Sequence, residues 1–407
     1  MSHTTEIYDV IIIGAGASGL ICALECARAP KKVLVLEKSA LPGRKILVSG
    51  NGRCNFTNRY LSADKYQADP SLINSVLQHF SFEDCLAYFD KLGVLYTEES
   101  KGRFFPQTNK ATAVTDALKA ALAETDADIF YNQEAVHIQK GKLFTVRTQN
   151  GLSFQAKKVV LSCGSCAYPQ VSGTQRGYEL ARSLGHTIVM PKPALSGLVL
   201  KENFSRLTGI RAQVTVSAAT QPAATADGEI IFTNYGINGP AALNISAAVS
   251  RALEEGNVPL SINFLPQLTN PNAFFCQRMK QFSCRKPKDF FAGLLHESIA
   301  NLLIDFKGLR KNKAMNEQSP AALQHTFETV VRWPATVTAL RGWNEAMIAI
   351  GGVNLREINY NTLESLRCPN LFITGELLDV AGISGGFNLH FAWASGFCAA
   401  QAITKES

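Results

Sequence analysis

Three glycines near the start of the chain have the spacing of a phosphate-binding turn. Gly14, Gly16 and Gly19 form a G-x-G-x-x-G pattern directly after the apolar run 9–13. In such a turn the first glycine bends the chain, the second lets backbone N–H groups approach a pyrophosphate, and the third allows a helix to pack closely on a strand. Glu37 follows about twenty residues later, where an acid that binds a ribose diol belongs. The spacing predicts a dinucleotide-binding site.

The secondary-structure elements that this turn needs are present on both sides of it. The run 9–13 is rich in β-branched residues, which is typical of a buried parallel strand. Apolar residues recur at helical spacing over 20–27, and a second apolar strand, 33–36, ends at Glu37. A glycine-rich turn in another kind of α/β domain is the alternative interpretation. The order of strand, turn, helix, strand and acid favours dinucleotide binding.

The segment that follows, 38–58, is dense in glycine, basic and small polar residues. Arg44, Lys45 and Arg53 supply cations, and the small residues over 49–52 let the backbone close on a flat ligand. A surface linker is the alternative. We expect a loop with a binding function here rather than a regular structural element.

The pattern of a strand, a glycine-rich turn and a helix occurs again near the end of the chain. An apolar strand beginning at Leu371 runs into Gly375 and Glu376, and three further glycines precede a predicted helix over 388–403. In flavoproteins that combine two such motifs, the late acid lies on the ribityl chain and the helix N-terminus faces the pyrimidine edge of the ring. A domain that binds only NAD does not need this second strand and helix. The pattern therefore favours FAD.

No second G-x-G-x-x-G pattern occurs in residues 60–407, so NAD(P)H is predicted to bind only transiently, as the hydride donor. No set of His, Cys and carboxylate residues has metal-ligand spacing, and no metal site is predicted. The residues predicted to bind FAD are Gly14, Gly16, Ala17, Ser18, Gly19, Glu37, Lys38, Arg44, Lys45, Ser49, Gly50, Val136, Ser162, Gly164, Gly375, Glu376, Gly386, Asn388 and Leu389.

Length and composition indicate an ordinary soluble protein with more than one domain. The chain has 407 residues, of which 46% are hydrophobic and 18% charged. It has no long apolar span and no secretory signal pattern, so a cytoplasmic protein without a membrane segment is expected. Its ten cysteines are predicted to be reduced thiols. Residues 71–92 are predicted to form a helix.

Four motifs make a family resemblance specific. They are Gly-Arg-Lys-x-Leu-x-Ser-Gly-x-Gly-Arg-Cys-Asn-x-Thr-Asn (43–58), Phe-Thr-x-x-Gly-x-x-Gly-Pro (232–240), Gly-Gly-Val (351–353) and the glycine-rich run 375–396. Over essentially its full length the chain resembles the BaiN/RdsA-like family of bacterial flavoproteins. It departs from the usual pattern at Asn51, where a third glycine is common, at Asn238, where serine is common, and at His390, where glutamine is common.

The resemblance implies an α/β fold with bound FAD and three domains. A Rossmann-type FAD-binding domain would come from both chain ends, 1–190 and 346–407. A β-barrel-like insert would comprise 191–269 with 334–345, and a basic helical insert would comprise 270–333. Relatives are associated with reduction of a uracil in ribosomal RNA, reduction of a steroid C=C bond, and oxidation of an aminoketone. The resemblance thus implies the cofactor more firmly than the substrate.

Positive charge is concentrated in one segment. The whole chain carries a formal net charge of +7, and between Pro271 and Arg341 eleven Lys or Arg stand against five Asp or Glu. Such a block can hold a phosphate backbone, which makes ribosomal RNA a possible partner of segment 271–341. A solvated helical surface that happens to be basic is the alternative, and the oligomeric state is left open.

Few residues near the predicted flavin could protonate a substrate carbon. Cys54, with Arg53 as a cationic neighbour that could tune its thiol, and His390, at the start of the last helix, are the candidates. Arg53 could stabilise an anionic enolate. A small buried cysteine and a histidine that fills a polar pocket are the structural alternatives. The pair Cys163 and Cys166 is predicted to form a small-residue turn rather than a redox dithiol.

The sequence and the resemblance together predict an FAD-dependent reductase of a conjugated C=C bond. The first choice is reduction of uridine to dihydrouridine in 23S ribosomal RNA, with NAD(P)H as hydride donor. The alternative is a small-molecule flavin oxidoreductase, either a C=C reductase or an amine oxidase, with no RNA substrate.

Overall fold

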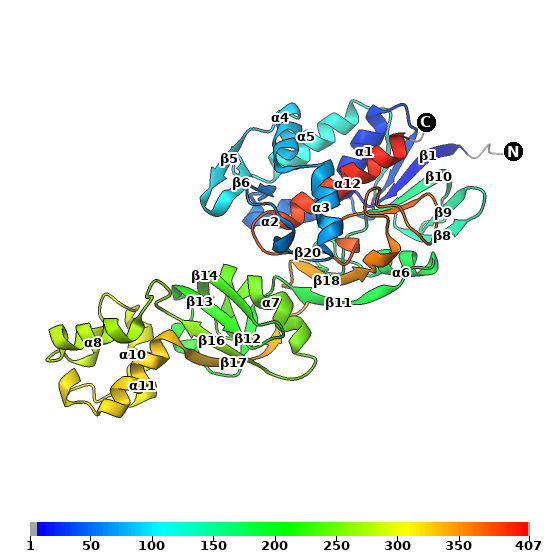
Figure 1. The fold of residues 1–407 in the computed structure, drawn as a ribbon. Coiled ribbons are helices and arrows are strands. Elements are labelled where there is room, and N and C mark those ends of the chain that lie inside the picture. Colours follow the sequence, from blue (N-terminus) through cyan, green and yellow to red (C-terminus); the bar gives the residue numbers. More distant parts are fainter. Residues whose placement is uncertain (1–5, 406–407) are drawn as a thin grey trace. The chain divides into compact units, whose positions relative to one another are not determined.

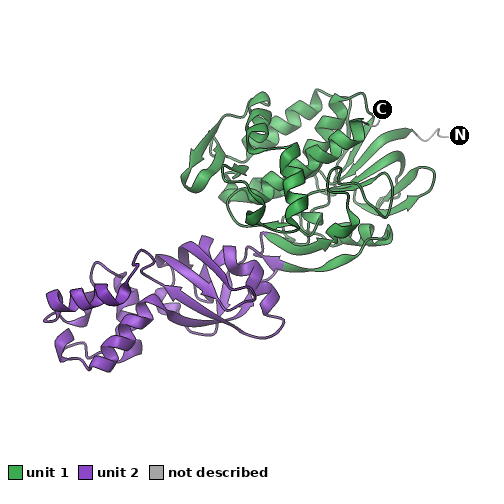
Figure 2. Ribbon diagram, in the orientation of Figure 1, with its two compact units in different colours: residues 1–192, 348–407 green, residues 193–347 purple. Residues whose placement is uncertain are grey.

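The computed structural model describes residues 6–405, and internal contacts divide the chain into two compact units (Figure 2). Residues up to 192, together with those from 348 onward, form the first unit. Residues 193–347 form the second unit, which is inserted into the first.

A seven-stranded sheet, mostly parallel at its centre, organises the first unit. Its strands are β1 (Ile7–Ile13), β2 (Val33–Leu36), β7 (Asp128–Phe130), β8 (Ala135–Lys140), β9 (Phe144–Thr148), β10 (Ser153–Leu161) and β19 (Leu371–Ile373). The order is β7-β2-β1-β10-β9-β8, and β19 pairs with β10. β1 runs parallel to both β2 and β10, and β10 runs parallel to β19, whereas β9 is antiparallel to β10. Because β19 joins this sheet, the C-terminal motif lies beside the N-terminal one.

The first and last helices of the unit pack against each other (Figure 1). α1 (Ala17–Arg28) follows the glycine turn, and α12 (Phe387–Lys405) ends the described chain. A Cβ on Gly396 would lie 2.2 Å from the carbonyl oxygen of Ser18, so only glycine allows the two backbones to come this close. The α/β fold with a Rossmann-type domain built from both chain ends is therefore confirmed.

Smaller elements surround this core. They are α2 (Arg44–Gly52), β3 (Thr57–Asn58), β4 (Tyr66–Gln67), α3 (Pro70–His79), α4 (Phe82–Lys91), β5 (Tyr96–Glu99), β6 (Arg103–Pro106), α5 (Thr112–Ala123), α6 (Arg176–Ser183), β11 (Ile188–Ala194), β18 (Ile348–Val353) and β20 (Ala381–Gly382). β3, β6 and β5 form a small sheet, β20 pairs with β4, and β11 pairs with β18.

Two predicted elements differ from the structure. The single helix predicted over 71–92 is two helices, α3 and α4, because Ser81 starts the second one: its side chain accepts a hydrogen bond from the Asp84 N–H and the Asp84 carboxylate accepts one from the Ser81 N–H. The segment 38–58, predicted as an irregular loop, contains helix α2, which is broken from Ser49 onward by non-helical backbone.

The second unit is built on a closed barrel of six strands, in the order β12-β15-β14-β13-β16-β17. They are β12 (Leu198–Leu200), β13 (Arg211–Ala218), β14 (Ala224–Phe232), β15 (Gly236–Asn238), β16 (Val258–Asn263) and β17 (Trp333–Leu340). Its helices are α7 (Pro240–Ala252), α8 (Pro271–Phe282), α9 (Pro287–Phe291), α10 (Glu297–Lys307) and α11 (Pro320–Val331). Phe290 and Leu303 of the helical segment share one hydrophobic core with Val216 and Ile262 of the barrel.

Within residues 6–405, no helix has the length and apolarity needed to cross a bilayer.

Gly19 and Gly16 provide a matched test of the packing under the turn. A Cβ on Gly19 would lie 1.9 Å from the carbonyl oxygen of Gly14, whereas nothing lies within 4 Å of a Cβ on Gly16. We expect Gly19→Ala to lower the free energy of unfolding by about 2 kcal/mol or more, because the overpacked backbone must shift. Gly16→Ala should stay within about 1 kcal/mol of the wild type, because the extended backbone of this N-cap residue accepts alanine and the lost N-cap preference for glycine is small. Urea unfolding of both variants checks this, and equal stabilities would contradict it.

Candidate functional site

The glycine turn and Glu37 lie at the carboxyl ends of β1 and β2. One carboxylate oxygen of Glu37 accepts a hydrogen bond from the Ala15 N–H at 2.8 Å, and the other accepts one from the Ser39 N–H at 2.7 Å. These two bonds fix the buried carboxylate beside the turn. Each oxygen has a further lone pair, so the group can still accept hydrogen bonds from a diol.

In the glycine turn, Gly14 is tightly packed against the backbone of Ser162, whereas Gly16 has open space beside it. Gly14 has φ +103°, and a Cβ there would lie 2.5 Å from the carbonyl oxygen of Ser162. The hydroxyl of Ser162 pairs with that of Thr374 at 2.8 Å, which ties β10 to β19. Gly16, by contrast, has open space beside it at the start of α1. The first N–H groups of α1 have no partner within the helix, so this opening suits an anion.

The C-terminal motif meets the N-terminal one through Gly375 and Glu376, in the short helix η6 (Gly375–Leu377). A Cβ on Gly375 would lie 2.7 Å from the hydroxyl oxygen of Ser18. Glu376 forms an ion pair with Lys45 at 2.5 Å and accepts a hydrogen bond from Ser165 at 3.1 Å. The structure therefore brings together predicted residues more than 300 positions apart in the sequence.

The second half of α2 and the residues just after it have strained backbone. Gly50, Asn51, Gly52 and Cys54 all have positive φ, of 55°, 59°, 80° and 61°. Asn51 and Cys54 carry side chains, for which this region is costly. Clusters of such residues are typical of ligand-binding loops, and this one stands where the sequence predicts a binding segment.

Arg53 does not tune the thiol of Cys54, contrary to the expectation from the sequence. The guanidinium pairs with Glu99 at 2.7 Å and 3.2 Å and stacks over the ring of Phe105 at 4.0 Å. Cys54 is fully buried, and burial raises the pKa of its thiol to about 12. The thiol is therefore neutral and has no access to solvent, which favours the structural alternative.

His390 is also fully buried and is bonded within the protein. Its Nδ1 lies 2.9 Å from the Thr57 hydroxyl and its Nε2 lies 3.0 Å from the carbonyl oxygen of Phe80. A carbonyl can only accept, so Nε2 carries the proton and Nδ1 accepts from Thr57. Burial lowers the pKa of this imidazole to about 4. The histidine thus ties α12 to β3 and to the end of α3.

The start of α12 offers backbone N–H groups rather than side chains. The carboxamide of Asn388 is bonded to the backbone of Gly382, where Oδ1 accepts from N–H and Nδ2 donates to the carbonyl, both at 2.8 Å. Gly386 has φ +104° and is crowded by the carbonyl oxygen of Thr57. The N–H groups of the first helical residues, Leu389 among them, have no partner within the helix.

The remaining predicted residues lie around the carboxyl end of the sheet. The half-buried Val136 is near the start of β8, just after a loop in which the Gln133 N–H donates to the Glu37 carbonyl at 2.8 Å. Burial lowers the pKa of Lys38, against the opposing effect of Glu134 and Glu37. Arg44 is exposed. Gly164 has φ +68° with open space beside it.

Cys163 and Cys166 are free thiols. Burial raises the pKa of Cys163 to about 12 and also raises that of Cys166. Neither shift favours a reactive thiolate. In the described part of the chain, no group of three His, Cys, Asp or Glu residues is arranged to hold a metal ion.

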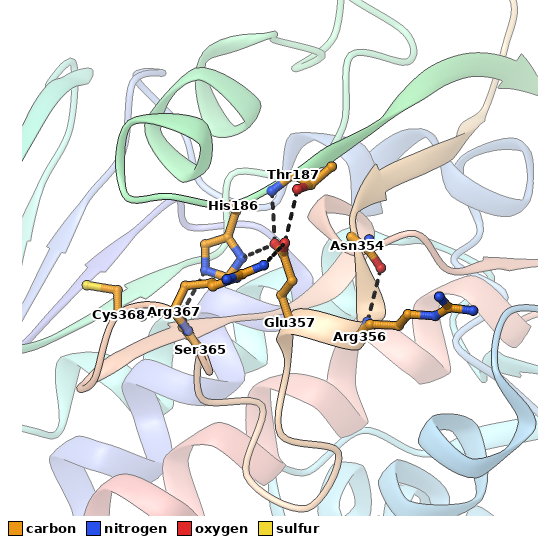
Figure 3. Close-up of polar contacts among 8 residues, drawn as sticks. All are labelled: His186, Thr187, Asn354, Arg356, Glu357, Ser365, Arg367 and Cys368. Carbon is orange, nitrogen blue, oxygen red and sulfur yellow. Dashed lines mark hydrogen bonds and ion pairs between the residues drawn. The ribbon is translucent and has the colours of Figure 1, made fainter.

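A buried polar cluster joins the residues just before β11 to the segment after β18 (Figure 3). His186 Nε2 lies 2.7 Å from the Ser365 hydroxyl, and His186 Nδ1 lies 3.1 Å from a carboxylate oxygen of Glu357. The positions are more than 170 apart in the sequence, so no spacing signal reveals them. The distances resemble a Ser-His-acid triad.

This cluster is structural rather than nucleophilic. The Ser365 hydroxyl oxygen already accepts hydrogen bonds from the N–H groups of Arg367 and Cys368, at 3.0 Å and 2.8 Å. Serine, histidine and glutamate are all buried. Burial alone would raise the pKa of Glu357, but hydrogen bonds from Thr187 and Arg367 lower it below the usual value. The ionised carboxylate joins the start of β11 to the segment after β18.

The family model of the HI0933-like protein Rossmann domain matches residues 8–402. The chain belongs to this family. It is 33% identical to a 3-dehydro-bile acid delta(4,6)-reductase of Clostridium scindens, over 97% of this chain and 98% of the relative. It is 28% identical to a ribosomal RNA dihydrouridine synthase of Haemophilus influenzae, also over 97% and 98%. The family resemblance predicted from the motifs is confirmed, and the chain is an oxidoreductase.

Solved structures support the fold. A quinol-fumarate reductase chain matches 99% of this chain and 72% of its own length, with a TM-score of 0.53 and 13% identity. A 3-ketosteroid delta1-dehydrogenase from Sterolibacterium denitrificans matches 99% of this chain and all of its own length, with a TM-score of 0.50 and 13% identity.

The buried state of His390 gives the stability of the fold a pH dependence. The pKa is about 4 in the folded protein and about 6.5 when unfolded, so the unfolded chain binds the proton first as pH falls. Stability is fully present above about pH 6.5 and decreases towards pH 4, by up to about 3 kcal/mol. His390→Gln, which removes the titrating group, should make the urea midpoint vary less over this range.

The exposed His137 of β8 supplies the control. His137→Gln should retain the wild-type pH profile of unfolding. If the profile of His390→Gln runs parallel to that of the wild type between pH 4 and 6.5, the buried neutral state assigned to His390 is wrong.

Proposed function

We propose that this chain is an FAD-dependent reductase of a C=C bond conjugated to a carbonyl group. The observation that carries the proposal is the junction of the two chain ends, where Gly16, Glu37 and Glu376 lie at one edge of the sheet and α12 packs against α1. Family membership supports the same conclusion.

The residues at this junction fit FAD. The open space beside Gly16 and the free N–H groups of α1 suit the pyrophosphate, and the fixed carboxylate of Glu37 suits the adenosine ribose. Glu376, held by Lys45, suits the ribityl chain. The N–H groups at the start of α12 suit the pyrimidine edge, where reduced flavin carries negative charge.

Bound FAD would supply the hydride, and NAD(P)H is proposed to replenish it. In this proposal the chain positions the cofactor and the substrate, and the proton that completes the reduction comes from solvent. Neither Cys54 nor His390 delivers the proton, because both are fully buried. Arg53 is only partly buried and keeps the proposed role of stabilising negative charge on an enolate, with its guanidinium oriented by Glu99.

A small hydrophobic enone is the substrate class that we propose first. The relative with the higher identity is named as a delta(4,6)-reductase of a 3-dehydro-bile acid, and double bonds at positions 4 and 6 are conjugated with a 3-carbonyl. The uracil ring presents the same electronic feature, a C=C bond next to a carbonyl. One cofactor arrangement can therefore serve either substrate.

Uridine in ribosomal RNA is the second candidate, and the basic segment supports it. Lys280, Arg285 and Lys286 are exposed around the end of α8 and form no ion pair in the described structure. Other cations of the segment are neutralised locally, such as Lys288 by Glu297 and Lys311 by Asp305. These three exposed cations are the proposed contact for a phosphate backbone. A cytoplasmic location is proposed as well.

Gly16→Ala tests the cofactor site. The added methyl group fills the space proposed for the pyrophosphate, so we expect the affinity for FAD to fall about tenfold or more. Titration of the apoprotein, followed by flavin fluorescence, measures this. A wild-type protein that binds no FAD, or a variant that binds FAD as tightly as the wild type, would contradict the proposed site.

A triple variant, Lys280→Ala with Arg285→Ala and Lys286→Ala, separates the two substrates. Consumption of NADH or NADPH with a 3-oxo-4,6-diene steroid should be the same in variant and wild type. If RNA is the substrate, the steroid is not reduced, and deletion of the gene abolishes a dihydrouridine that mass spectrometry detects in ribosomal RNA. The wild-type gene should then restore that dihydrouridine and the triple variant should not.

A further inference from the structure

Asn55 carries a buried polar group that the protein does not satisfy. The residue is only 9% exposed, and its Oδ1 has no hydrogen-bond partner in the described structure. A buried acceptor without a donor costs about 1 to 3 kcal/mol, so proteins rarely retain one without a use. A bound molecule with an N–H or O–H group would remove this cost.

The neighbouring polar side chains of Thr57 and Asn58 already have hydrogen-bond partners within the protein. The Thr57 hydroxyl bonds to His390, and the Asn58 amide donates to the carbonyl oxygens of Gly385 and Lys101 at 2.8 Å and 3.2 Å. These bonds tie the segment to α12, to Gly385 just before it, and to Lys101. Asn55 belongs to the same segment but contributes no such bond.

The position of Asn55 points to the cofactor site. A Cβ on Gly386, the residue before α12, would lie 2.9 Å from Asn55 Oδ1. A Cβ on Gly50 would lie 2.8 Å from the Asn55 backbone nitrogen. Asn55 therefore lies between the strained turn of α2 and the start of α12, and its carboxamide is next to the start of α12, which is proposed to face the pyrimidine edge of the flavin ring.

We propose that the Asn55 carboxamide binds the imide edge of the flavin ring, with Oδ1 accepting a hydrogen bond from N3–H. The inference rests on the proposed function, because it requires bound FAD. N3–H is the single N–H donor of the oxidised ring, and it lies between two carbonyl oxygens. A carboxamide presents an acceptor and a donor side by side, so it complements this edge in the way that asparagine complements adenine. Asn55 is thus a positioning residue for the flavin.

FAD methylated at N3 tests the proposal directly, because it lacks the donor. The wild type should bind FAD about tenfold or more tightly than the methylated form. Asn55→Ala should weaken FAD binding about tenfold and distinguish the two flavins by less than about threefold. Asn55→Asp keeps an acceptor of the same shape and should keep the preference for FAD. Flavin fluorescence titration of each apoprotein measures these affinities.

Asn58→Ala is the matched control, since that asparagine is buried in the same segment but bonded within the protein. It should lower the urea midpoint of the apoprotein and keep the wild-type preference for FAD over the methylated form. Asn55→Ala should not lower the midpoint, because it removes an acceptor that has no partner.

Two results would overturn the inference while leaving the proposed function standing. One is Asn55→Ala binding FAD as the wild type does, or with the same preference over the methylated form. The other is a loss of apoprotein stability in Asn55→Ala equal to that in Asn58→Ala, which would make Asn55 structural. A wild type that binds no FAD is a distinct result, and it would overturn both proposals.

Discussion

The close contact of α1 with α12 is the constraint on which the candidate site depends. Gly396 lets the backbone of α12 approach the carbonyl oxygen of Ser18, and Gly375 packs against the hydroxyl of the same serine. Side chains at either glycine would separate the last helix and β19 from the glycine turn. The groups proposed for the two ends of FAD would then no longer lie at one edge of the sheet. The proposed cofactor site therefore depends on close backbone packing between two segments that are distant in the sequence.

The buried polar side chains near the start of α12 are of two kinds: those with hydrogen-bond partners in the protein, and Asn55, whose Oδ1 has none. His390, Thr57 and the indole of Trp393, which donates to the Phe56 carbonyl at 3.0 Å, connect α12 to the segment 55–58. Their hydrogen bonds are satisfied within the protein, so they hold the site together. Asn55 lies among them without a partner, and that difference separates a binding group from a structural one.

The second unit contains the basic segment on which the choice between the two proposed substrates depends. It has its own core, shared by barrel and helical segment, and part of its positive charge is neutralised by local ion pairs. Family members with equal coverage of this chain are named for reactions on a steroid and on RNA. The fold and family therefore constrain the cofactor chemistry more tightly than the substrate.

Local patterns in the sequence were sufficient for the fold class and the family. The spacing of Gly14, Gly16, Gly19 and Glu37 is a backbone requirement, and such requirements are visible in sequence because few residues satisfy them. The roles of Cys54 and His390 could not be predicted, because the residue type is the same whether the side chain is buried or reactive. Burial and hydrogen-bond partners come from segments hundreds of residues away, so only the tertiary structure decided that these two side chains are buried and that the Asn55 carboxamide has an acceptor without a partner.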